Sequence, residues 1–216
     1  MSDLRCTLLS DGSSDRALLF VFDWLLQELR PLITVRSQWA DLRQLRKPPR
    51  ELSKRIATAV DLFPCDLLFI HRDAEREPLE DRSQEIQIAV ERAFEGAGRR
   101  VPTVAVVPVR MQEAWLLSCE GAIRKASGNP RGDHLLDIPD ARKWEALADP
   151  KQVLSDLLRR ASGATGRRLR KLNTPQMIQR VAELTPEFSP LRRLTAFQTF
   201  EANLAEALAQ IPTNDA

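Results

Sequence analysis

The chain contains 216 residues, of which 43% are hydrophobic and 29% are charged, and its formal net charge is +2. These values exclude wholesale disorder and predict either one α/β domain with an appendage or two small domains. No apolar run approaches the roughly 20 residues of a membrane-spanning helix. The first residues also lack the basic start and apolar centre of a signal peptide. We therefore expect a cytoplasmic protein that has no membrane segment.

In the first half of the chain, short apolar runs typical of strands alternate with helical patterns. Strands are predicted at residues 4–10, 32–36, 66–70 and 101–109. Helices are predicted at residues 14–29, 41–62 and 82–95, the second of them in two pieces broken by Lys47-Pro48-Pro49. The β-α-β-α-β-α-β order predicts an α/β fold with a four-stranded, mainly parallel sheet flanked by helices.

From residue 111 onward the sequence pattern is helical. Helices are predicted at residues 111–125, 150–160 and 191–210. Thr174-Pro175 and Ser189-Pro190 are typical helix starts, with a capping residue followed by proline. We therefore expect an α/β domain over residues 1–110 and a helical C-terminal region over residues 111–216 that packs on it.

Polar residues follow three of the predicted strands. Ligands bind beyond the carboxyl ends of the strands in open parallel sheets, so residues at these ends are expected to share one rim. If the chain stays extended after residue 70, alternate side chains there point to the same side. The candidate rim residues are Asp11, Asp15, His71, Asp73, Glu75 and Glu113.

A cluster of carboxylates at this rim would suit Mg²⁺ or Mn²⁺. Such an ion could activate water and neutralise the charge on a phosphodiester in the transition state. We expect the metal ligands to be Asp11, Asp73, Glu75 and Glu113. In the alternative interpretation, Asp11 is only a helix cap and Glu75 is a solvated loop charge.

A basic run without any acidic residue surrounds a Gly- and Ser-containing loop at residues 162–166. Paired arginines beside such a loop can contact a phosphate backbone, each contact adding salt-dependent affinity. The alternative is a solvated loop between two helices. The candidate nucleic-acid-binding residues are Arg159, Arg160, Arg167, Arg168, Arg170 and Lys171.

Two blocks resemble the signature blocks of the TOPRIM fold of topoisomerases, bacterial primases and nucleases of the overcoming-lysogenization-defect class. They are the Asp-Gly-x-x-Asp turn at residues 11–15 and the Phe-Ile-His-Arg-Asp strand end at residues 69–73. A third block spans residues 107–117. The third block is similar to small stand-alone TOPRIM-like bacterial proteins that are encoded beside ABC-type ATPases in mobile or defence loci. Asp149-Pro150-Lys151 and the aromatic pair Phe197 and Phe200 also fit that group.

The resemblance implies a Mg²⁺ site in which Asp11 takes the position of the family's first acid and Asp73 holds the metal. Two positions depart from the family pattern. Asp11 replaces the usual Glu, and His71 stands where the Asp-x-Asp pair should begin. His71 could be a ligand for Mn²⁺ or a later transition metal, or a proton donor to the leaving oxygen. Alternatively, it marks a site that has lost catalysis.

Two functions follow from this resemblance. In the first, the chain is a metal-dependent phosphodiesterase or nuclease acting on DNA or RNA, and its catalytic residues are Asp11, Asp73 and His71. It would act with an ATPase partner in a bacterial defence or mobile-element system. In the alternative, it is a catalytically degenerate binding or regulatory subunit of an ATPase complex, with Trp39 or Trp144 as exposed contacts. The sequence has no G-x-x-x-x-G-K-[ST] phosphate loop, so ATP hydrolysis would come from the partner.

Overall fold

The computed structural model describes residues 3–98 and 100–212. The chain divides into two compact units. The first unit comprises Met1–Val107 with Thr199–Ala216, and the second comprises Pro108–Gln198. The boundary at residue 107 lies close to the one expected at residue 110. Residues 199–212, however, belong to the first unit, whereas the sequence pattern had placed them in the C-terminal helical region.

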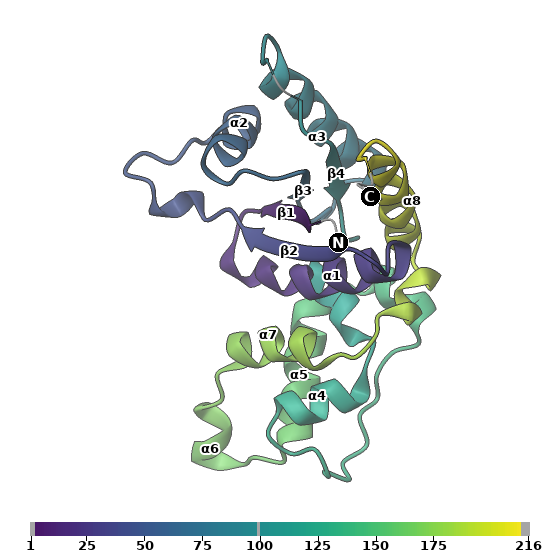
Figure 1. The fold of residues 1–216 in the computed structure, drawn as a ribbon. Coiled ribbons are helices and arrows are strands. Elements are labelled where there is room, and N and C mark those ends of the chain that lie inside the picture. The colour runs from purple at the N-terminus through teal and green to yellow at the C-terminus, as the bar shows by residue number, and fades with distance from the viewer. Residues whose placement is uncertain (1–2, 99, 213–216) are drawn as a thin grey trace. The chain divides into compact units, whose positions relative to one another are not determined.

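The first unit is built on a sheet of four parallel strands in the order β2-β1-β3-β4 (Figure 1). Its strands are β1 (Asp3–Leu9), β2 (Thr34–Trp39), β3 (Leu67–His71) and β4 (Thr103–Val106). The helices along this part of the chain are η1 (Ser13–Ala17), α1 (Leu18–Leu29), η2 (Leu42–Gln44), α2 (Leu52–Leu62) and α3 (Leu79–Phe94). The predicted four-stranded parallel sheet flanked by helices is confirmed.

Strand β2 begins later than the sequence pattern indicated. The apolar run was expected to start a strand at Leu32, but Leu32 is 88% exposed and the strand begins at Thr34. Strand β4 is likewise shorter than predicted and ends at Val106. By contrast, β3 is buried at every position, as its continuously apolar sequence predicted for a central parallel strand.

The strand order creates a switch point between β1 and β3. The chain leaves β1 for β2 on one side, then crosses to β3 on the other side of β1. Crossover connections that diverge in this way leave a crevice at the carboxyl ends of the two strands from which they diverge. The residues after Leu9 and after Ile70 therefore border the position where open α/β sheets bind ligands.

The two faces of the sheet carry separate cores. On one face, the Phe69 ring lies 4.3 Å from that of Phe22 in α1, and the Phe22 ring lies 5.3 Å from that of Phe200 in α8 (Thr195–Ala209). On the other face, Leu68 and Ile70 belong to a cluster with residues of α2 and α3. The aromatic contacts show that α8, although last in the sequence, completes the core of the first unit.

The second unit is helical along the described chain. Its elements are η3 (Gln112–Leu117), α4 (Glu120–Ala126), η4 (Ala141–Ala146), α5 (Pro150–Ser162), α6 (Gly166–Arg170), α7 (Thr174–Leu184) and η5 (Ser189–Arg193). The helix expected at residues 111–125 is thus two shorter elements. Asp149 caps α5 by accepting a hydrogen bond from the Gln152 N–H at 2.8 Å, and Asn173 caps α7. Among the described residues, none of the helices is long and apolar enough to span a bilayer.

Candidate functional site

The turn after β1 is closed by the buried carboxylate of Asp15. Asp15 Oδ2 accepts a hydrogen bond from the Gly12 N–H at 2.9 Å, and its Oδ1 accepts one from the Ser14 hydroxyl at 3.1 Å. The Asp-Gly-x-x-Asp sequence therefore forms a tight connection from the strand into η1. This turn holds the Asp15 carboxylate in a fixed position at the end of β1.

His71, the last residue of β3, lies between two carboxylates. Its side chain is 3% exposed, with Nδ1 3.5 Å from Oδ2 of Asp15 and Nε2 3.3 Å from Oδ1 of Asp73. Both distances are long for hydrogen bonds, and no well-formed hydrogen bond from either ring nitrogen is found within the described part of the chain. The contacts are therefore best described as charge pairs across a buried ring.

The surroundings of His71 favour its charged form. Burial by itself disfavours the imidazolium, but interactions with Asp15 and Asp73 outweigh it and raise the pKa of His71 to about 9. Burial also acts to raise the pKa of Asp15, yet the interactions with His71, Gly12 and Ser14 leave that pKa below its ordinary value. At neutral pH the site therefore holds an imidazolium between two carboxylates.

Asp11 is neutralised by two arginines. Its carboxylate forms an ion pair with Arg55 of α2, and Arg72 Nε lies 3.6 Å from its Oδ2. Arg55 also donates a hydrogen bond to the Ser10 carbonyl at 2.7 Å, so its guanidinium is anchored at the end of β1. The Asp11 side chain is nevertheless 54% exposed. The structure thus brings Asp11 to the predicted rim with its charge already balanced.

Glu75 does not continue the alternation expected after β3. It adopts a left-handed backbone conformation with φ of 54°, and the Glu77 N–H donates to the Ala74 carbonyl at 2.9 Å. Because the chain turns here, the extended geometry that would have placed Glu75 beside Asp73 ends at Asp73. Glu75 is exposed to solvent in this turn.

Glu113 belongs to the second unit, where it is the second residue of η3. Its side chain is buried, and Lys151 Nζ lies 3.7 Å from Oε1. Within that unit the Glu113 charge therefore has a basic neighbour from α5. The role of Glu113 as a metal ligand together with Asp11 and Asp73 stays a prediction.

A small crevice of about 280 Å³ opens beside Asp11 at the carboxyl ends of β1 and β2. Arg43, Arg50 and Arg55 line it together with Trp39. The Arg43 guanidinium stacks over the Trp39 ring at 4.8 Å from its centroid. Sequence reasoning missed Arg55 and Arg72 as site residues. The one available signal was the position of Arg72 between His71 and Asp73.

Neither tryptophan considered as an exposed contact is fully exposed. Trp144 is 4% exposed and donates a hydrogen bond to the Pro139 carbonyl at 2.7 Å. Trp39 is half-buried and donates to the Ser10 hydroxyl at 2.9 Å. Trp144 therefore packs inside its own unit, and Trp39 belongs to the wall of the strand-end crevice.

The basic run of the second unit is exposed along its length. Its charged members are Arg159, Arg160, Arg167, Arg168, Arg170 and Lys171. Arg160 pairs with Asp137 at 2.7 Å, whereas the other five have no acidic side chain within ion-pair distance among the described residues. Arg168 and Lys171 line an open cavity of about 690 Å³ together with His134. This surface can therefore accept an anionic ligand.

The residues after β1 and β3 do not form a metal site as they stand. Among the described residues, no group of three or more His, Cys, Asp or Glu side chains is arranged to hold a metal ion. Both oxygens of Asp15 already accept hydrogen bonds. A protonated His71 has no lone pair to offer a metal. The arrangement therefore does not fit a metal site that includes Asp15 or His71.

Comparisons with known proteins identify no relative of this chain. No protein-family model, curated protein or solved structure matches the chain. Inferences about function therefore rest on the geometry of the strand-end site and of the basic surface.

Proposed function

We propose that this chain is a catalytically degenerate TOPRIM-like binding or regulatory subunit of a cytoplasmic ATPase complex, in a bacterial defence or mobile-element system. The observation that carries the proposal is the placement of the His71 ring between Asp15 and Asp73, at 3.5 and 3.3 Å. The link to an ATPase partner rests on the sequence resemblance alone.

The imidazolium supplies the positive charge that a cluster of carboxylates requires. Two carboxylates close together repel each other, and a cation between them relieves that repulsion. In a metal-dependent site the cation is the catalyst, which polarises water and the phosphoryl group. Here His71 occupies the space between Asp15 and Asp73, and its raised pKa keeps it charged at neutral pH. The site is therefore electrostatically complete without a metal.

The remaining chemistry favours binding of phosphate groups. Arg50 lines the crevice beside Asp11 together with Arg43 and Arg55, which pair with Asp41 and Asp11, and arginine is well suited to bidentate phosphate contacts. In the second unit, five basic side chains of the run from Arg159 to Lys171 have no acidic partner among the described residues. Both surfaces support binding of DNA or RNA without hydrolysis.

A calorimetric titration with Mn²⁺ and then Mg²⁺ tests the proposal. Wild type and the Asp73→Ala variant should give the same small heats, because Asp73 is engaged by His71 and not by a metal. Wild type should also leave single- and double-stranded DNA and RNA intact in either metal. Mn²⁺ binding by wild type that is lost in Asp73→Ala, together with metal-dependent cleavage, would contradict the proposal.

That contradicting result would support the second candidate, a Mg²⁺- or Mn²⁺-dependent phosphodiesterase or nuclease. One observation favours it. Asp11 and Asp73 follow neighbouring strands, and their side chains are 54% and 27% exposed. Mg²⁺ is often held by only one or two carboxylates together with waters and substrate phosphates. In this case a metal would have to compete with Arg55 and Arg72 for Asp11.

A further inference from the structure

Strand β4 forms an open edge of the sheet. In the described sheet its strand neighbour is β3, to which it is joined by hydrogen bonds from the Leu68 N–H to the Pro102 carbonyl at 2.9 Å and from the Arg72 N–H to the Val106 carbonyl at 3.2 Å. In a parallel ladder, alternate residues of a strand bond to one neighbour and the residues between them face the other side. The backbone N–H and C=O groups of Thr103 and Ala105 therefore face the open edge.

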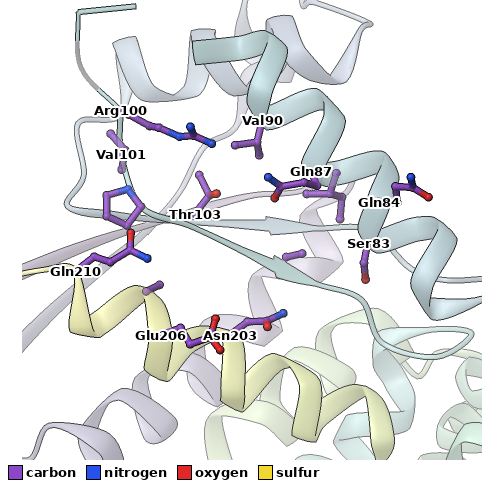
Figure 2. A pocket seen from close by; sticks show the side chains of 14 residues that line it. Ser83, Gln84, Gln87, Val90, Arg100, Val101, Thr103, Asn203, Glu206 and Gln210 are labelled. Atoms are coloured by element: carbon purple, nitrogen blue, oxygen red, sulfur yellow. The ribbon is translucent and has the colours of Figure 1, made fainter. Parts of the chain in front are cut away.

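These open backbone groups lie along a groove in the first unit. The groove has a volume of about 890 Å³, and both Thr103 and Ala105 line it. Figure 2 shows that its two sides come from α3, with Gln84 and Gln87, and from α8, with Asn203. The edge of β4 is thus accessible between two helices that are far apart in the sequence.

The lining of the groove mixes polar with apolar side chains and carries no dominant charge. The amides of Gln84, Gln87, Asn203 and Gln210 can each donate and accept hydrogen bonds. The two charged side chains in the lining, Arg100 and Glu206, have opposite signs. A nucleic acid would favour a basic lining, and an amphipathic helix would favour an apolar one. The lining found here suits the alternating donors and acceptors of an extended backbone.

We propose that the β4 edge, between α3 and α8, binds an extended peptide segment of a partner protein, which adds to the sheet as a fifth strand. The four residues of β4 would pair with a segment of similar length, on the order of 13 Å long at about 3.3 Å per residue. Main-chain hydrogen bonds to Thr103 and Ala105 supply affinity in this recognition mode, and neighbouring side chains supply specificity.

Pro102 leaves the open edge usable by an added strand. It lacks an N–H, but it lies in the set of residues that faces β3, so it removes no donor from the open side. Residues of both α3 and α8 line the groove, so an added strand would lie between these two helices. The inference uses no residue of the strand-end site and does not rest on the function proposed above.

The test begins with a phage-displayed library of random heptapeptides selected on the whole protein. A selected peptide is then synthesised unmodified and with N-methyl groups at alternate residues, in the two possible registers. The unmodified peptide should slow amide hydrogen exchange at Thr103 and Ala105, measured by NMR, with little change at Val104 and Val106, which already bond to β3. N-methylation in one register should weaken binding by about tenfold or more, and in the other register much less.

Side-chain variants locate the binding surface. The exposed amide substitutions Gln84→Ala and Asn203→Ala should each weaken peptide binding several-fold, whereas Gln44→Ala, an exposed amide of the same unit outside the groove, should not. The proposal is overturned if no peptide is selected, or if selected peptides leave the Thr103 and Ala105 amides unprotected. It is also overturned if these amides become protected on self-association of the protein without peptide, since the occupant is then a second copy.

Discussion

Nδ1 of His71 lies 3.5 Å from Oδ2 of Asp15, so two residues far apart in the sequence form one buried charge pair. The contact joins the end of β3 to the turn after β1. Asp15 is held in turn by the Gly12 N–H, which fixes the orientation of the pair. A buried pair of this kind contributes little when intact, but removal of one partner leaves the other charge uncompensated. The first predictions follow from that asymmetry.

We expect Asp15→Asn to destabilise the protein more than Asp73→Asn. Asp15 is buried and accepts two further hydrogen bonds, whereas the Asp73 side chain is 27% exposed and water can replace part of its role. The loss for Asp15→Asn should be about 1–3 kcal/mol in the free energy of unfolding. Urea unfolding of wild type and both variants at pH 7 measures the difference. The reverse order of stability would show that Asp73 is the main partner of His71.

The stability of the protein should fall as pH rises from about 6.5 to about 9. The pKa of His71 is raised from 6.5 to about 9 in the folded chain, so the folded state binds the proton more tightly than the unfolded state. The resulting stabilisation is complete below pH 6.5 and is lost as pH rises through 9. Measurements should stop near pH 9, because burial raises the pKa of the Cys6 thiol and ionisation of the unfolded chain then adds a further loss.

Urea unfolding across this range should show the loss in wild type and not in His71→Gln. The chain has a second histidine, His134, which is exposed in the second unit and provides a matched control. His134→Gln should retain the loss. If His71→Gln and wild type had the same pH dependence, the imidazolium would not be the charged species in this site.

Sequence reasoning reached the fold and part of the site because both depend on local patterns. The apolar run of β3 and the Asp-Gly turn after β1 are readable within a few residues. Parallel topology then brings the ends of β1 and β3 together, and with them Asp15, His71 and Asp73. The same reasoning could not indicate Arg55, because an arginine on the polar face of an amphipathic helix such as α2 gives no signal of its target.

The predictions that differ from the structure depend on features that local sequence patterns do not contain. The turn at Glu75 depends on a left-handed backbone conformation that its sequence, Ala-Glu-Arg-Glu, does not mark with glycine or asparagine. The assignment of α8 from Thr199 onward to the first unit is accompanied by contacts of Phe200 with Phe22 and Phe69, which no local pattern contains. Trp144 was expected to be exposed because its sequence neighbours are polar, but its side chain is buried whereas those of Arg142 and Lys143 are exposed.

Phe200→Ala should strongly destabilise the first unit. The Phe200 ring contacts those of Phe22 and Phe69, with centroids 5.3 and 6.1 Å away, and all three side chains are buried. Truncation of a buried phenylalanine costs about 3–5 kcal/mol. Leu32→Ala is the control, because Leu32 is 88% exposed and should change stability very little. Chemical denaturation measures the change in the free energy of unfolding. A loss below about 1 kcal/mol for Phe200→Ala would show that α8 contributes little to the core beside the sheet.

We expect His71→Asp to create a requirement for a divalent cation. The substitution replaces the imidazolium with a third carboxylate between Asp15 and Asp73, and the resulting repulsion should lower the melting temperature in the presence of a chelator. Mn²⁺ should restore part of the lost melting temperature, because a bound ion stabilises the folded state according to its concentration and affinity. His71→Asn adds no charge and should not respond. Equal stabilisation of wild type by Mn²⁺ would favour the metal-dependent candidate.

Binding of nucleic acid should depend on the exposed basic run of the second unit. The double charge reversal Arg167→Glu with Arg170→Glu removes two side chains that have no acidic partner among the described residues. Each lost phosphate contact should reduce the slope of log affinity against log salt concentration by about 1. We therefore expect weaker binding to a DNA duplex and to single-stranded RNA, with a shallower salt dependence.

The control for this experiment changes the net charge by the same amount elsewhere in the same unit. Arg131 and Arg180 are both exposed, and the variant Arg131→Glu with Arg180→Glu matches the charge of the first variant. Fluorescence anisotropy between 50 and 300 mM salt compares the two variants with wild type. If both variants weaken binding equally, attraction is a property of the overall charge, and the run from Arg159 to Lys171 is a solvated loop. Loss confined to the first variant assigns the phosphate contacts to that surface.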